Sequence, residues 1–181
     1  MGKRGRIAVF GRADAAPGGE EYGRARALGR GLAAAGFRVA TGGYGGVMEA
    51  VSLGAREGGA ETEGVLCTAF RTRIPNSYLD RAVWTDDLFA RTRGLVEGAD
   101  GFVAMEPRVG TLSEVTFVWA LWKAALLPPR PMVLVGAAWE AVLAPLNQFA
   151  VMEKNLLDYL GCVPGPAEAL ERLGRAFPEG T

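Results

Sequence analysis

A glycine-rich stretch is the first feature of the chain that could bind a ligand. It reads Gly42, Gly43, Tyr44, Gly45 and Gly46. Glycine lets backbone N–H groups approach a ligand closely, and a helix that follows adds the positive end of its dipole. The stretch has neither the GxGxxG pattern nor the lysine of a P-loop. Two interpretations stay open: a tight turn between strand and helix, and an anion-binding loop. We favour the loop, because four glycines exceed the needs of a turn.

The second candidate begins at Gly110 and Thr111 and ends at Glu114. Thr111 and Glu114 have the spacing of a capping box, in which hydroxyl and carboxylate each accept from a backbone amide at a helix start. That interpretation needs no ligand. In the other, Gly110 and Thr111 begin a helix beneath a phosphate, because the first N–H groups of a helix have no partner within it. The local sequence leaves both open.

Charged residues lie just before the second stretch and just after the first apolar run. Glu106 would repel a phosphate if it faced the site, whereas Arg108 would attract one. Pro107 between them removes one backbone donor. Arg12 follows the first apolar run and is either a further phosphate contact or a solvated arginine. We include Arg12 and Arg108 among the predicted binding residues.

The residue types that are missing also limit the chemistry. The chain contains no histidine, which excludes Ser-His-Asp and Cys-His hydrolases. Acid–base chemistry must come from Asp, Glu, Lys, Tyr, Cys or the substrate. Cys67 and Cys162 are too few for a disulfide framework or a zinc site. We therefore expect no metal and no cofactor.

Composition indicates an ordinary globular protein. The 181 residues are 49% hydrophobic, and the formal net charge is zero. We expect one domain over residues 1–181, without the basic surface of a nucleic-acid-binding protein. No apolar run is long enough to span a bilayer, and the N-terminus lacks a signal-peptide pattern. The expected compartment is the cytoplasm, with no membrane partner.

The elements that must position these residues alternate along the chain. Predicted strands cover 6–10, 37–40, 61–66, 81–84, 101–105 and 131–135. Predicted helices cover 20–35, 47–58, 87–98, 111–127 and 139–148, with one or two more in the last forty or so residues. Continuously apolar strands are typical of a parallel sheet covered on both faces. The predicted fold class is α/β, a doubly wound (Rossmann-like) parallel sheet with helices on both faces. Such a sheet binds ligands at the carboxyl ends of its strands, where both candidate stretches lie.

The predicted helix over 111–127 suggests assembly. Its apolar residues, Trp119 and Trp122 included, leave few polar positions on any face. A helix that is apolar all round is buried on all sides. We expect a homodimer with Trp119 or Trp122 near the interface. The alternative is a helix covered by the C-terminal segment.

Taken together, residues 6–150 resemble the LOG family, long misannotated as lysine decarboxylases. Residues 41–50 are similar to its GGGxxGLMxA segment, and closer to the GGxGGVMEA form of relatives labelled molybdenum-cofactor carriers. Residues 87–91, followed by 99–100, resemble DMxxR…SD. Residues 110–114 match the end of PGGxGTxxE, but Glu-Pro-Arg replaces Pro-Gly-Gly at 106–108. The first strand also ends differently, with Gly-Arg-Ala-Asp in place of a run such as GSSS.

The resemblance implies a function and a site. LOG enzymes hydrolyse nucleoside 5′-monophosphates to free base and ribose 5-phosphate, and by position Arg91 and Glu114 would be the catalytic pair. Thr111 and the N–H groups of the helix start would hold the phosphate. The family also forms dimers through equivalent helices. The alternative is a non-catalytic nucleotide or molybdenum-cofactor carrier or sensing module. A purely structural dimer would leave the glycine stretch unexplained. The expected partner is a nucleotide or another phosphorylated small molecule.

Overall fold

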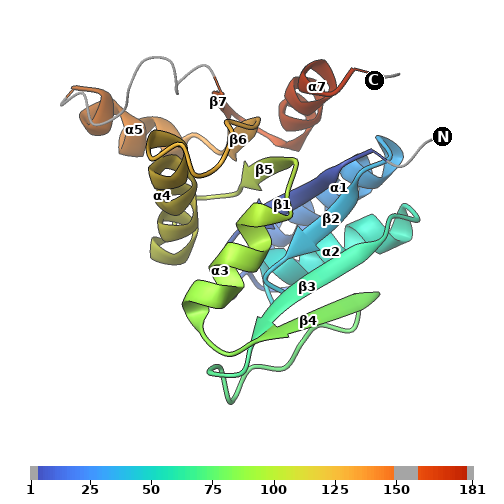
Figure 1. The fold of residues 1–181 in the computed structure, drawn as a ribbon. Coiled ribbons are helices and arrows are strands. Elements are labelled where there is room, and N and C mark those ends of the chain that lie inside the picture. Colours follow the sequence, from blue (N-terminus) through green and yellow to red (C-terminus); the bar gives the residue numbers. More distant parts are fainter. Residues whose placement is uncertain (1–3, 149–158, 179–181) are drawn as a thin grey trace.

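The computed structural model describes residues 4–148 and 159–178. Its strands form one sheet in the order β4-β3-β2-β1-β5-β6-β7, and every neighbouring pair is parallel (Figure 1). The strands are β1 (Arg6–Phe10), β2 (Arg38–Thr41), β3 (Thr62–Cys67), β4 (Arg81–Thr85), β5 (Gly101–Ala104), β6 (Met132–Val135) and β7 (Leu160–Val163). The predicted α/β class is confirmed.

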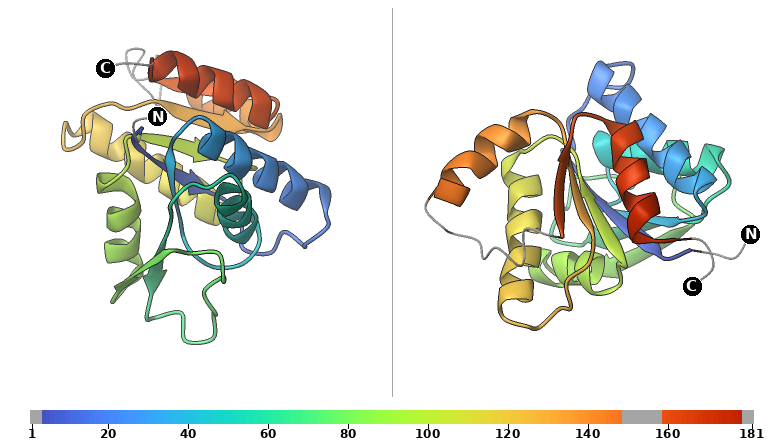
Figure 2. Two further views of the ribbon diagram at one scale, coloured as in Figure 1. Left: turned by 90° about the vertical axis from the view of Figure 1, so that its right-hand side faces the viewer. Right: turned by 90° about the horizontal axis from the view of Figure 1, so that it is seen from above.

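Helices cover both faces of this sheet, as the continuously apolar strands predicted. One layer holds α1, α2 and α7, and the opposite layer holds α3, α4 and α5 (Figure 2). The helices are α1 (Glu20–Ala34), α2 (Val47–Glu57), α3 (Leu88–Glu97), α4 (Val109–Lys123), α5 (Ala138–Gln148) and α7 (Pro166–Ala176). β1, β5 and β6 are buried along their whole length because both faces are covered. None of the described helices is both long and apolar enough to cross a bilayer.

The strand order reverses between β1 and β5. From β1 the chain steps outward to β2, β3 and β4, and then returns to the other side of β1 with β5. The connections that leave these two strands pass to opposite layers, β1 to α1 and β5 to α4. This divergence opens a crevice at their carboxyl ends, the usual ligand position in such a sheet.

Two features of the C-terminal half differ from the prediction. Residues 160–163 form β7 beside β6, where we expected only helices. A run of four residues is too short to reveal its partner strand from sequence. The helix predicted over 111–127 begins earlier, at Val109, and ends earlier, at Lys123. Part of the predicted C-terminal region, 149–158, lies outside the described residues.

The tryptophans of α4 face into the chain. Trp119 is 7% exposed and Trp122 is 4% exposed, and both belong to the core between α4 and the sheet. Neither has much surface left for a partner chain, so their expected place at an interface finds no support. The homodimer itself stays a prediction.

Candidate functional site

A cavity of about 490 Å³ lies at the carboxyl ends of β1 and β5, where the strand order reverses. This volume is typical of small-molecule sites. Seven of the residues singled out from sequence line it: Arg12, Gly42, Arg91, Arg108, Gly110, Thr111 and Glu114. The other three, Gly43, Gly45 and Gly46, are not among its described lining residues.

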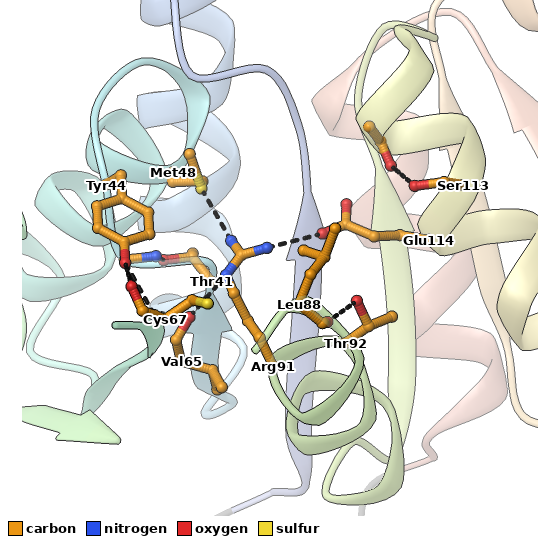
Figure 3. Close-up of polar contacts among 12 residues, drawn as sticks. Thr41, Tyr44, Met48, Val65, Cys67, Leu88, Arg91, Thr92, Ser113 and Glu114 are labelled. Atoms are coloured by element: carbon orange, nitrogen blue, oxygen red, sulfur yellow. Dashed lines mark hydrogen bonds and ion pairs between the residues drawn. The ribbon is translucent and has the colours of Figure 1, made fainter. Parts of the chain in front are cut away.

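Arg91 is held in the cavity wall by α3. The carboxylate of Asp87 caps this helix by accepting from the Ala90 amide at 2.7 Å, so Arg91 lies one turn into the helix. The guanidinium is buried, and its Nε donates to the Val65 carbonyl at 3.0 Å. Its Nη2 lies 3.8 Å from the Met48 sulfur (Figure 3). These contacts leave Nη1 to point at α4.

Glu114 faces Arg91 from α4. The distance from Arg91 Nη1 to Glu114 Oε1 is 3.6 Å (Figure 3). Burial raises the pKa of Glu114 to about 7, although the charge of Arg91 lowers it. Burial also lowers the pKa of Arg91, and Glu114 opposes that shift. A carboxyl group that titrates near neutral pH can act as general base or acid, which this histidine-free chain requires.

The start of α4 presents unused hydrogen-bond donors. Arg108 is the N-cap, and no side chain caps the helix. The first amide bonded within the helix is that of Leu112, which donates to the Arg108 carbonyl at 2.7 Å. The amides of Val109, Gly110 and Thr111 therefore have no partner within the helix and lie at the cavity.

Of the two interpretations left open for Thr111 and Glu114, the capping box is wrong. Since the helix begins at Val109, Thr111 is its third residue and not its cap. Its side-chain oxygen is buried and has no hydrogen-bond partner in the described chain. Glu114 points to Arg91 and not back to the helix start. The two residues thus have separate contacts, and the hydroxyl of Thr111 remains available to a ligand.

The glycine stretch is packed against protein. A Cβ at Gly42 would lie within 1.6 Å of Arg91 Nη2, so this glycine makes room for the guanidinium. Gly43 and Gly46 have positive φ angles of 76° and 68°. A Cβ at Gly46 would lie 2.6 Å from the Arg12 carbonyl oxygen. Close packing accounts for these glycines without a ligand.

The charged side chains of Arg12, Glu106 and Arg108 differ in whether they are available to a ligand in the cavity. Arg12 contacts Asp14 at 3.1 Å and Glu21 at 3.2 Å, so two carboxylates already offset its charge. Glu106 lies 3.6 Å from Arg24 and is not among the described lining residues of the cavity. Arg108 does line the cavity and is exposed. The carboxylate of Glu106, which could repel a phosphate, therefore contacts Arg24 outside the described lining of the cavity.

Phe70 and Arg73 are among the lining residues that sequence reasoning missed. They belong to the segment between β3 and β4, which we expected only to be a loop. The carboxyl end of β3 shares the edge of the sheet with the candidate site, and loops at that edge commonly carry function. That position was the one available signal, and it does not single out individual residues.

The chain thus combines a Rossmann-like parallel sheet with a candidate site in which the Arg91–Glu114 pair lies near an uncapped helix start. Residues 4–129 match the SLOG cluster4 family, and the chain belongs to this family. The resemblance to LOG and molybdenum-cofactor-carrier proteins is thereby confirmed.

Solved structures resemble this one along nearly the whole chain. TM1055, a structural-genomics target, is 26% identical with a TM-score of 0.75, covering 95% of this chain and 99% of that one. The molybdenum cofactor binding protein from the phototrophic bacterium Rippkaea orientalis is 26% identical with a TM-score of 0.75, covering 95% and 96%. The molybdenum cofactor carrier protein from Chlamydomonas reinhardtii is 25% identical with a TM-score of 0.73, covering 96% and 98%. A search of curated proteins found no match.

Proposed function

We propose that this protein binds a nucleoside 5′-monophosphate in the cavity and hydrolyses its N-glycosidic bond. The products are the free base and ribose 5-phosphate. The observation that carries the proposal is the Arg91–Glu114 pair, which is 3.6 Å apart in the wall of a cavity that also holds an uncapped helix start.

The start of α4 is the proposed phosphate site. The amides of Val109, Gly110 and Thr111 and the positive end of the helix dipole favour an anion there. The Thr111 hydroxyl, buried without a partner among the described residues, supplies a further donor. Arg108 lines the same end of the cavity and adds a positive charge.

Glu114 is the proposed general base and charge stabiliser. Water attacks C1′ of the ribose while the bond from C1′ to the base nitrogen breaks, and its electron pair leaves with the base. The Glu114 carboxylate accepts the proton of the water and returns it to the base nitrogen. The sugar gains positive charge in the transition state, and the carboxylate stabilises it. Arg91, fixed by the Val65 carbonyl, orients the carboxylate.

A non-catalytic carrier is the second candidate. Two structures that cover nearly the whole chain at 25–26% identity are described as molybdenum cofactor binding or carrier proteins. In this alternative, the α4 start holds an anionic group of the ligand, and the ligand leaves unchanged.

The deciding experiment is incubation with nucleoside 5′-monophosphates and chromatography of the products. Wild type should release free base and ribose 5-phosphate. Glu114→Gln should slow release about 100- to 1,000-fold while binding changes little, since the amide keeps the shape and loses the charge. Glu106→Gln is the matched control, because this carboxylate is not among the described lining residues. Absence of base release from every nucleotide would reject hydrolysis and favour the carrier.

A further inference from the structure

Another cationic side chain, that of Arg73, lies in the cavity wall and is exposed. Its guanidinium carbon lies 4.7 Å from the centre of the Phe70 ring and 5.8 Å from that of Tyr44. No carboxylate among the described residues is within ion-pair distance of Arg73. The aromatic contacts therefore position this cation, and its N–H groups are not engaged by an acidic side chain.

The segment that carries Arg73 is fixed to the glycine stretch. The backbone amide of Asn76 donates to the Gly43 carbonyl at 2.9 Å, and its side-chain amide donates to the Tyr44 carbonyl at 3.1 Å. The Tyr44 hydroxyl accepts from the Cys67 amide at 2.9 Å. The amide of Arg73 donates to the Phe70 carbonyl at 3.1 Å. The glycine stretch thus holds in place the segment that forms one wall of the cavity.

The polar groups along the cavity have a definite order. Thr111 lies at the α4 start, and Glu114 follows one turn later beside Arg91. The guanidinium of Arg91 is 5.8 Å from the Phe70 ring, which Arg73 also contacts. Burial lowers the pKa of Arg91, and the nearby charge of Arg73 lowers it further. A nucleoside 5′-monophosphate has the same order of phosphate, C1′ and base.

With its phosphate at α4 and C1′ at Glu114, a nucleotide would extend its base toward Arg73. A guanidinium only donates hydrogen bonds. Two of its N–H groups fit two neighbouring acceptors, as in the contact of arginine with O6 and N7 of guanine. Adenine carries an amino group where guanine carries O6. An N–H of Arg73 would then face this amino group, and neither donor would have an acceptor. Oxo-pterins present a similar edge of carbonyl oxygen beside ring nitrogen.

We propose that Arg73 selects ligands whose fused ring carries a carbonyl oxygen beside an acceptor nitrogen, and that it disfavours 6-aminopurines. The two sources of this chemistry are 6-oxopurine nucleotides and phosphorylated oxo-pterins. The inference rests on the proposed function only for the placement of phosphate and sugar. Arg73 is a specificity residue here and takes no part in bond cleavage.

Calorimetric binding to the Glu114→Gln protein tests this without turnover. The probes are GMP, IMP, AMP, neopterin monophosphate and ribose 5-phosphate. GMP and IMP should bind at least about 10-fold more tightly than AMP. Arg73→Gln should shift the preference toward AMP, because an amide matches N6 and N7 of adenine. The affinity of Arg73→Gln for ribose 5-phosphate, which carries no base for Arg73 to recognise, should stay the same.

Arg71→Gln is the matched control, since Arg71 is exposed on the same segment and is not among the described lining residues. It should leave every affinity unchanged.

Equal affinity for GMP and AMP in the presence of Arg73 would overturn the inference, as would an equal weakening of all probes by Arg73→Gln. An Arg73-dependent preference for GMP without base release by the wild-type protein would support the inference and reject hydrolysis. Arg73-dependent binding of neopterin monophosphate alone would identify the pterin as the source, and no binding of any probe would overturn both proposals.

Discussion

The glycine stretch at 42–46 and the start of α4 occupy equivalent places in the sheet, yet they differ in what fills them. Each connects the carboxyl end of a parallel strand to a helix. In the first, the Val47 amide at the start of α2 already donates to the Arg12 carbonyl at 2.9 Å. In the second, Val109 is 89% exposed, and a Cβ on Gly110 would meet no described atom within 4 Å. The glycine-rich connection is filled by protein, and the glycine-poor one is open to a ligand.

The charges in the first turns of α2 and α4 support the same distinction between a filled and an open connection. Glu49 lies in the first turn of α2, where a carboxylate already interacts with the positive end of the dipole. The first turn of α4 contains no acidic residue, and Thr111 has a buried oxygen without a described partner. In this molecule, glycines mark close packing against other parts of the protein, whereas unsatisfied donors indicate the ligand site.

Substituting one glycine in each region gives the largest expected contrast. Gly46→Ala should destabilise the protein by about 3 kcal/mol or more, because its φ of 68° and its nearest backbone contacts both exclude a side chain. Gly110→Ala should leave the free energy of unfolding unchanged or raise it by up to about 1 kcal/mol, because Gly110 lies in a helix with open space around it. Urea denaturation of both variants measures the difference. Equal losses of stability in Gly46→Ala and Gly110→Ala would contradict the contrast between a filled and an open connection.

The buried carboxyl of Glu114 should make stability depend on pH. Its folded pKa of about 7 lies above the unfolded value of 4.5, so the folded state binds the extra proton between these values. Wild type should therefore lose stability as pH rises from about 4.5 to 7, by at most about 3 kcal/mol. Glu114→Gln, which has no charge to bury, should be the more stable protein at pH 8.

Thermal unfolding across this pH range measures the effect and contains its own control. At pH 4 the carboxyl is largely protonated in both states, so wild type and Glu114→Gln should have similar melting temperatures. A variant that is less stable than wild type at pH 8 would show that the attraction to Arg91 outweighs the cost of burial. The carboxylate would then be held as a structural ion pair.

Much of the fold could be predicted from sequence because its strands are buried on both faces. Phe102, Val103 and Ala104 are fully buried, as a continuous apolar run in a covered parallel sheet requires. β7 could not be predicted in the same way, because its pairing with β6 is a tertiary contact. The start of α4 was misplaced by two residues because Thr111 and Glu114 fit a capping box that the fold does not use.

The Arg91–Glu114 pair was predictable only because a family motif carried it, whereas Gly110 and Thr111 were found from the local pattern of a helix start. Arg91 and Glu114 are distant in sequence, and the motif resemblance alone paired them before the structure brought them to 3.6 Å. No motif marks Arg73, because its place in the cavity wall depends on its contacts with the rings of Phe70 and Tyr44. The elevated pKa of Glu114 follows from burial, which the sequence of one helix does not specify.

Removing the Thr111 hydroxyl should have opposite effects on folding and binding. Thr111→Val eliminates a buried oxygen that has no described partner, so the unliganded protein should gain about 1 kcal/mol of stability. A capping role would have predicted a loss. Affinity for a nucleoside monophosphate should fall about 10-fold, because a hydrogen bond to a charged group is lost.

The matched control is Thr116→Val on the same helix. Thr116 is exposed, and its hydroxyl donates to the Leu112 carbonyl at 2.9 Å. Calorimetry should find its ligand affinity unchanged. A loss of stability in Thr111→Val without loss of affinity would mean that the hydroxyl has a structural partner and that the α4 start is no more open than the glycine stretch.

The smallest effect is expected at Glu106, the residue that made a phosphate site at α4 look unfavourable in the sequence. Its carboxylate lies 3.6 Å from Arg24 and beside Gly136, where a Cβ would come within 2.4 Å of it. Glu106→Gln should cost at most about 1 kcal/mol of stability, as is typical of a partly exposed ion pair. Ligand affinity, measured by calorimetry, should change by less than about 2-fold. A gain of about 10-fold or more would mean that the carboxylate repels the bound phosphate. The open start of α4 would then be a poorer anion site than its free donors suggest.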